Sequence, residues 1–80
     1  MRYSLIIGQY VFQGHYILTT IRDRTICSRY DAERRADHIL TEIQENGSTV
    51  VTGETSVGKV KKVLISRDQG PVDIEIGEYK

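Results

Sequence analysis

The sequence contains one cysteine, Cys27, one proline and no tryptophan. A lone cysteine cannot form a disulfide within the chain, which agrees with a reducing compartment. No apolar run approaches the roughly 18 residues that a membrane-spanning helix needs, and the apolar run near the N-terminus is too short for a signal peptide. We therefore expect a cytoplasmic protein without a membrane partner.

Residues that bind metals or carry out catalysis are also scarce. Cys27, His15 and His38 are too few and too widely spaced for a structural zinc site, whose ligands come in close pairs. His38 and Glu42 have the i,i+4 spacing of two metal ligands, but on a helix face that is already polar we interpret them as solvated neighbours. Cys27 with a histidine would need a third, orienting group and an anion hole, and the sequence indicates neither. We predict no catalytic residue, no metal site and no cofactor.

Eighty residues are enough for one domain, spanning 1–80, with one modest core. The chain is 39% hydrophobic and 28% charged, which is within the globular range. A domain of this size has no room for a cleft between domains.

Residues 31–46 give the clearest helix signal. Their apolar residues follow the 3.6-residue period of one helix face: Ala32, Ala36, Ile39, Leu40 and Ile43. Either Asp31 or Ser28 can accept the free N–H groups of the first turn. Gly47 suits the left-handed conformation that ends many helices.

The rest of the chain favours short strands. Residues 22–24 are either a turn before a third strand or part of a strand running from 16 to 28. Gly8 lies where the alternation of strand 3–12 changes face, which predicts a bulge or a close backbone approach. The expected strands are 3–12, 16–21, 25–27, 48–52, 60–66 and 72–76, with turns at 13–15, 53–58 and 69–71.

These elements predict an α+β fold of the order ββ(β)αβββ. Short connections favour a mostly antiparallel sheet of five or six strands, with one α-helix packed on one face. The other face must be solvated, closed by curling or covered by a partner. The expected core is Leu5, Ile7, Ile17, Ile21, Ala36, Ile39, Leu40, Ile43, Val51, Val63, Ile65, Ile74 and Ile76.

Residues 53–59 resemble a Walker-type phosphate-binding loop, Gly-x-x-x-x-Gly-Lys. Val60 occupies the position of the hydroxyl that holds magnesium, and a strand is expected where the motif requires a helix. We interpret the segment as a hairpin loop and rank nucleotide binding through Gly53 and Lys59 last.

Charge is zero overall but distributed in blocks. Residues 1–35 carry six Arg against three acids, 36–58 carry four acids and no base, and 59–67 carry four bases and no acid. Such blocks suit cross-strand pairs or a charged partner. Arg forks bind phosphate, and Tyr rings stack on bases or anchor protein interfaces. The candidate binding residues are Tyr16, Arg22, Arg24, Arg29, Tyr30, Arg34, Arg35, Lys59, Lys61 and Lys62.

Small size, a half-covered sheet and charge blocks together favour a non-enzymatic protein-binding module. It would be an inhibitor or accessory protein, or a homodimer that pairs sheet faces or edges. Small inhibitors from phages and mobile elements, such as anti-CRISPR proteins, are of this size and type. The alternative is an RNA- or DNA-binding module that uses the Arg, Tyr and Lys residues, and an enzyme ranks behind both.

Overall fold

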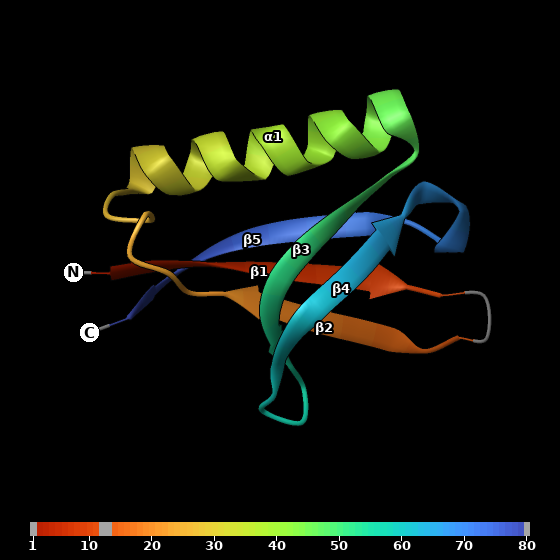
Figure 1. Cartoon of the computed structure of the whole chain (residues 1–80), viewed down its shortest axis with the longest axis horizontal. Coiled ribbons are helices and arrows are strands. Elements are labelled where there is room, and N and C mark those ends of the chain that lie inside the picture. Colours follow the sequence, from red (N-terminus) through yellow and green to blue (C-terminus); the bar gives the residue numbers. More distant parts are fainter. Residues whose placement is uncertain (1, 12–13, 80) are drawn as a thin grey trace.

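The computed structural model describes residues 2–11 and 14–79 of the chain. They form β1 (Arg2–Tyr10), β2 (Tyr16–Ile21), α1 (Arg29–Asn46), β3 (Ser48–Thr55), β4 (Val60–Ser66), the single 3-10 turn η1 (Arg67–Gln69) and β5 (Val72–Tyr79). All the pairings are antiparallel, in the order β4-β3-β2-β1-β5 (Figure 1). Over the described residues the fold is thus the predicted α+β arrangement, with one α-helix packed against five antiparallel strands.

Helix α1 begins two residues before the predicted start because Ser28 is the N-cap. The Ser28 hydroxyl accepts the Asp31 N–H, and the Asp31 carboxylate accepts the Cys27 N–H. Gly47 ends the helix as predicted, at φ 85°, and its N–H donates to the Ile43 carbonyl. This described helix lacks the long apolar stretch that crossing a bilayer would require.

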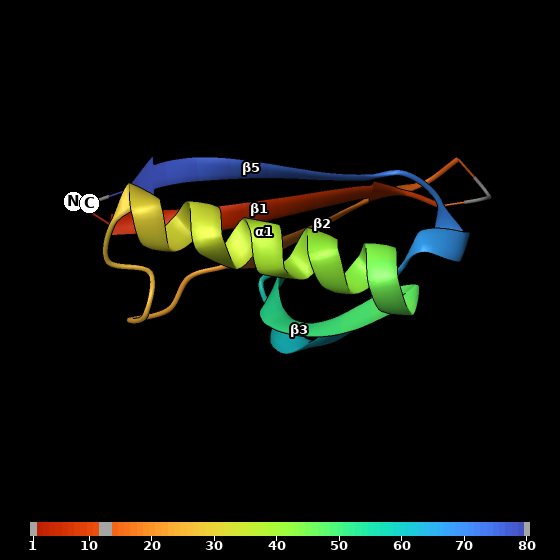
Figure 2. The same cartoon turned by 90° about the horizontal axis from the view of Figure 1, so that it is seen from above.

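The sheet turns sharply between β2 and β3. These strands pair only at Thr19 with Thr55 and at Thr20 with Glu54, whereas β1 pairs along most of its length with both neighbours. Beyond this short pairing the β3–β4 hairpin crosses in front of β1 and β2 (Figure 1). Seen from above, α1 lies over the space between β1 and β5 on one side and β3 on the other (Figure 2). The curled sheet and the helix therefore enclose one core between them.

The Gln9 side chain connects β1 to the end of β4 and to the turn that follows it. Its amide Nε2 donates to the Ser66 carbonyl at 2.6 Å and to the Gly70 carbonyl at 3.3 Å. Arg67 joins the end of β4 to the helix, because its backbone N–H donates to the Gly47 carbonyl and its guanidinium to the Gln44 carbonyl. These bonds fix where the hairpin lies relative to α1.

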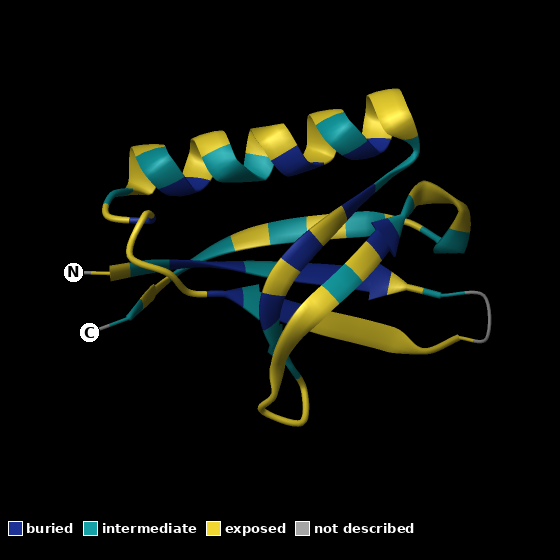
Figure 3. Ribbon diagram, viewed as in Figure 1, coloured by how far each residue is buried: buried dark blue, intermediate teal, exposed yellow. Residues whose placement is uncertain are grey.

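The buried core comprises Leu5, Ile7, Ile21, Ile26, Ala32, Ile39, Ile43, Val51 and Ile65, with Tyr3, Ala36, Val63, Val72, Ile74 and Ile76 packed against it (Figure 3). The prediction that Ile17 and Leu40 belong to this core is wrong, because both are exposed. Ile17 pairs with Gln9 towards the end of the β1–β2 pair, and Leu40 borders a shallow hollow beside Pro71 and Val72.

Three local predictions also need correction. Neither a strand at 25–27 nor one strand from 16 to 28 forms, because the Asp23 carboxylate accepts the Thr25 N–H and turns the chain. The hairpin turn is shorter than 53–58, since β3 continues to Thr55. Gly8 marks neither a bulge nor a close backbone approach: pairing continues through it, and the Tyr16 side chain lies where its Cβ would be. Phe12 and Gln13, predicted as the end of a strand and the start of a turn, lie outside the described residues.

Candidate functional site

The predicted binding residues do not form one surface. They are divided between the first turns of α1, the loop after β2, strand β2 itself and the β3–β4 hairpin, which lie in different parts of the molecule (Figure 1). The contacts of each group show which residues stabilise the fold and which are available to a ligand.

The basic residues on α1 are largely engaged with other side chains. Arg29 forms ion pairs with Glu33 at 3.4 Å and with Glu78 at 3.9 Å. The Arg34 guanidinium lies 5.8 Å from the centre of the Tyr30 ring, within the range of a cation–π contact. These exposed contacts contribute little to stability, but they cover part of the cationic surface predicted here.

Arg35 has a structural role in the loop after β2. It lies 3.5 Å from the Asp23 carboxylate and donates to the Thr25 hydroxyl at 2.6 Å. Burial alone would raise the pKa of Asp23, but the hydrogen bonds from Thr25 and the Arg35 charge outweigh it and lower that pKa. The Asp23 charge is therefore already balanced within the fold.

Tyr16 lies on the convex face of the sheet, where its ring packs over Gly8. The Tyr10 and Tyr16 ring centres are 4.6 Å apart, with the ring planes tilted by 53°. This aromatic pair is exposed, but it lies on a different strand pair from the lysines.

The lysines belong to the β3–β4 hairpin. The Thr55 N–H donates to the Lys59 carbonyl and the Gly58 N–H donates to the Thr55 carbonyl, so residues 55–59 close a tight turn between two strands. Gly53 lies within β3 and Lys59 directly before β4. The segment that resembles a phosphate-binding loop is thus a β-hairpin with a strand after its lysine, as we interpreted it.

Exposed apolar side chains share one face of the same hairpin. Val50 pairs with Leu64 and Thr52 with Lys62, so these residues point to the same side. Glu54 pairs with Val60 further along that side. We call this surface the outer hairpin face and define it as Val50, Thr52, Glu54, Val60, Lys62 and Leu64.

The exposure of this face is high for aliphatic side chains. Val50 is 59% exposed, Val60 69% and Leu64 54%. Strand β4 is also an edge of the sheet, so one side of its backbone has no partner strand among the described residues. Lys62 places a positive charge on this face between Val60 and Leu64, and Lys59 directly precedes Val60, whereas Lys61 pairs with Gly53 on the opposite face.

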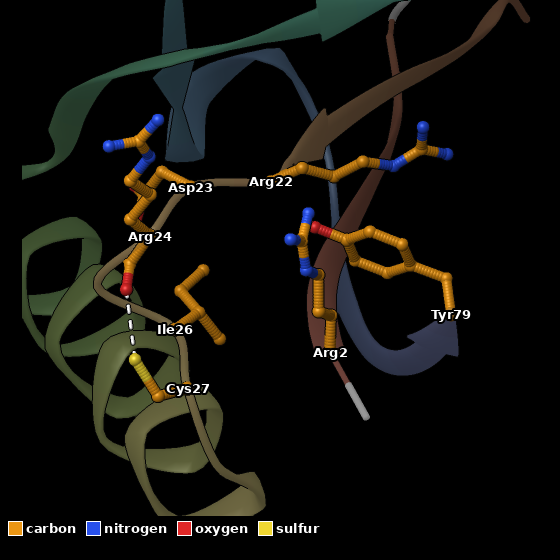
Figure 4. A pocket seen from close by; sticks show the side chains of 7 residues that line it. All are labelled: Arg2, Arg22, Asp23, Arg24, Ile26, Cys27 and Tyr79. Atoms are coloured by element: carbon orange, nitrogen blue, oxygen red, sulfur yellow. Dashed lines mark hydrogen bonds between the residues drawn. The ribbon is translucent and has the colours of Figure 1, made fainter.

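Arg22 and Arg24 lie elsewhere, at a cavity of about 480 Å³ beside the end of the sheet where both termini lie (Figure 4). Its walls come from the start of β1, the end of β5 and the loop after β2. The other residues that line it are Arg2, Asp23, Ile26, Cys27 and Tyr79.

The sequence prediction missed the aliphatic half of the outer hairpin face. The signal was present, because Leu64 and Ile65 are adjacent apolar residues near the end of strand 60–66 and so point to opposite faces of the sheet. A core that lies on one face of the sheet can bury only one of them. Arg2 and Tyr79 were missed for a different reason, because no local pattern brings the two ends of the chain together.

Comparisons of the chain with protein families, with curated proteins and with solved structures found no match. Within residues 2–11 and 14–79, no group of three or more His, Cys, Asp or Glu residues is placed to hold a metal ion. The functional proposals below therefore depend on the surfaces of the molecule itself.

Proposed function

We propose that this protein is a non-enzymatic protein-binding module that holds its partner on the outer hairpin face. One observation carries the proposal: Val50, Val60 and Leu64 extend from one side of an edge hairpin and are each more than half exposed. Burial of these aliphatic groups against a partner removes them from water and lowers the free energy of the complex.

The surroundings of the face indicate the chemistry of the partner. Lys62 lies on the face and Lys59 directly before Val60, while Glu54 is the one acidic residue of the face. A partner with an apolar centre and an acidic rim complements this surface, and charge complementarity would also speed association. The free edge of β4 offers backbone groups to an extended partner segment.

The test compares two matched charge substitutions in affinity capture from cells of the source organism. Leu64→Asp places a carboxylate beside Val50 on the face, and Tyr30→Asp places one at an exposed aromatic position of α1. We expect wild type and Tyr30→Asp to capture the same protein, quantified by mass spectrometry, and Leu64→Asp to lose it. Circular dichroism verifies that both variants are folded.

Three other results would contradict the proposal. One is equal capture by wild type and Leu64→Asp. Another is a concentration-dependent dimer that persists in Leu64→Asp, measured by sedimentation, because it would place self-association elsewhere. The third is oligonucleotide binding that weakens steeply with salt and is lost when Lys61 and Lys62 become Glu, because it would favour the nucleic-acid alternative.

A further inference from the structure

The cavity beside the chain ends concentrates positive charge. Arg2 and Tyr79 are paired residues on β1 and β5, and Arg22 and Arg24 come from the loop after β2. Figure 4 shows Asp23, Arg24, Ile26 and Cys27 on one side and Arg2 and Tyr79 on the other, with the Arg22 side chain extending over Tyr79. Three arginine residues thus line one space of about 480 Å³, a volume typical of sites for small molecules.

Acidic groups of the fold do not balance this charge. Asp23 also lines the cavity, but its carboxylate is bound by Thr25 and Arg35. None of the ion pairs within the described residues includes Arg2 or Arg24. Arg22 lies 3.8 Å from Glu54, and both side chains are about half exposed, so solvent screens that pair.

The cavity also has apolar and aromatic surface. The Arg22 guanidinium lies 5.3 Å from the centre of the Tyr79 ring, an arrangement that holds the cation beside an aromatic face. Ile26 is buried beneath the loop, and the Cys27 thiol donates to the Arg24 carbonyl at 2.9 Å (Figure 4). The loop carrying Arg24 is thereby fixed at several points.

We propose that this cavity binds a small organic phosphate monoester, with its phosphate among Arg2, Arg22 and Arg24. A phosphate monoester carries about −1.5 to −2 charges at neutral pH, which matches three guanidinium groups better than a single carboxylate does. Arginine forks bind phosphate oxygens in pairs, and the Tyr79 ring offers a contact to the organic part. This site meets the outer hairpin face at the Arg22–Glu54 pair but does not depend on the proposed function.

The primary experiment is an NMR titration of the whole ¹⁵N-labelled chain with AMP, adenosine and inorganic phosphate in turn. We expect AMP to give saturable amide shifts at residues 22–27 and 79, adenosine to give none, and inorganic phosphate to bind more weakly than AMP. Shifts spread evenly over all basic residues, or equal responses to AMP and adenosine, would overturn the proposal. Inorganic phosphate binding as tightly as AMP would overturn the assignment of an ester.

Two variants are expected to change the affinity for AMP in opposite directions, whereas misfolding would only weaken binding. The double variant Arg22→Gln with Arg24→Gln should weaken AMP binding by about tenfold or more, because it removes two charged hydrogen-bond donors. Glu54→Gln should tighten it by about two- to fivefold, because it frees Arg22 from a competing carboxylate. Arg34→Gln, outside the cavity, is the control. Unchanged affinity in the double variant would refute the site.

Cys27 provides a second readout in the unaltered protein. Its exposed thiol lines the cavity, so bound AMP should slow its alkylation by the neutral reagent iodoacetamide, and adenosine should not. Equal alkylation rates with and without saturating AMP would contradict binding at this position.

Discussion

Val50 and Leu64 are adjacent in sequence to Val51 and Ile65, yet the two pairs have opposite surroundings. Val51 is 7% exposed and Ile65 2%, while Val50 and Leu64 are each more than half exposed. The same two strands thus present one aliphatic face to the core and a similar aliphatic face to solvent. Since only the inner face packs into the core, the outer face is available for binding. Substitutions on each face can therefore test stability and binding separately.

The largest expected effect is the contrast between Ile65→Ala and Leu64→Ala. Ile65→Ala removes buried methyl groups and leaves a cavity, so it should lower the free energy of unfolding by about 2–5 kcal/mol. Leu64→Ala should change it by less than about 0.5 kcal/mol, as surface substitutions usually do. Urea unfolding of both variants measures the difference, and similar losses of stability would mean that the outer face is part of the core.

A smaller effect is expected where the hairpin crosses β2. A Cβ on Gly53 would lie 2.7 Å from the Thr19 methyl carbon and 2.9 Å from the Thr20 carbonyl oxygen. Gly53→Ala should therefore cost about 1–3 kcal/mol through overpacking, measured by thermal or urea unfolding. Thr52→Ala, the neighbouring change on the outer face, is the control. No loss in Gly53→Ala would show that the two strands can move apart.

The smallest effect concerns the loop after β2. Its Asp23 carboxylate is bound within the fold, whereas the neighbouring Arg22 and Arg24 line the cavity. The pKa of Asp23 is lowered, so the ionised carboxylate stabilises the folded state above its usual value of 3.8. That contribution is lost as the pH falls below 3.8 through the lowered value. Asp23→Asn should reduce this pH dependence, measured as thermal midpoints from about pH 5 to about pH 2.5. An unchanged profile would contradict this role for Asp23.

The elements with strong local signals were predicted correctly. Strand β4 has the expected limits, Val60–Ser66, and the helix has the expected Gly47 end and Ser28 cap. Ser28 and Asp31 were left as alternative acceptors of a first-turn N–H, and the structure uses Ser28; the Asp31 carboxylate instead accepts the N–H of Cys27, which precedes the helix. Such features depend on contacts between residues a few positions apart, which a sequence displays directly.

The candidate site was harder to predict because its residues come from separate segments. The helix and the hairpin hold the predicted cationic residues apart, and the cavity brings Arg22 and Arg24 together with Arg2 and Tyr79 from the two ends of the chain. The exposure of Ile17 and Leu40 has a similar cause. Periodicity shows which face of an element a side chain occupies, but not how far the opposing element extends over it.

The sequence by itself determined the fold class, the identity of most strands and the C-terminal end of the helix, because propensity, periodicity and capping act over short distances along the chain. Only the tertiary structure decided which of two aliphatic faces of the hairpin is buried and which arginines share a cavity. The physical reason is the sharp turn of the sheet at Gly53, which swings the hairpin across β1 and β2 so that one face packs inward and the other meets solvent.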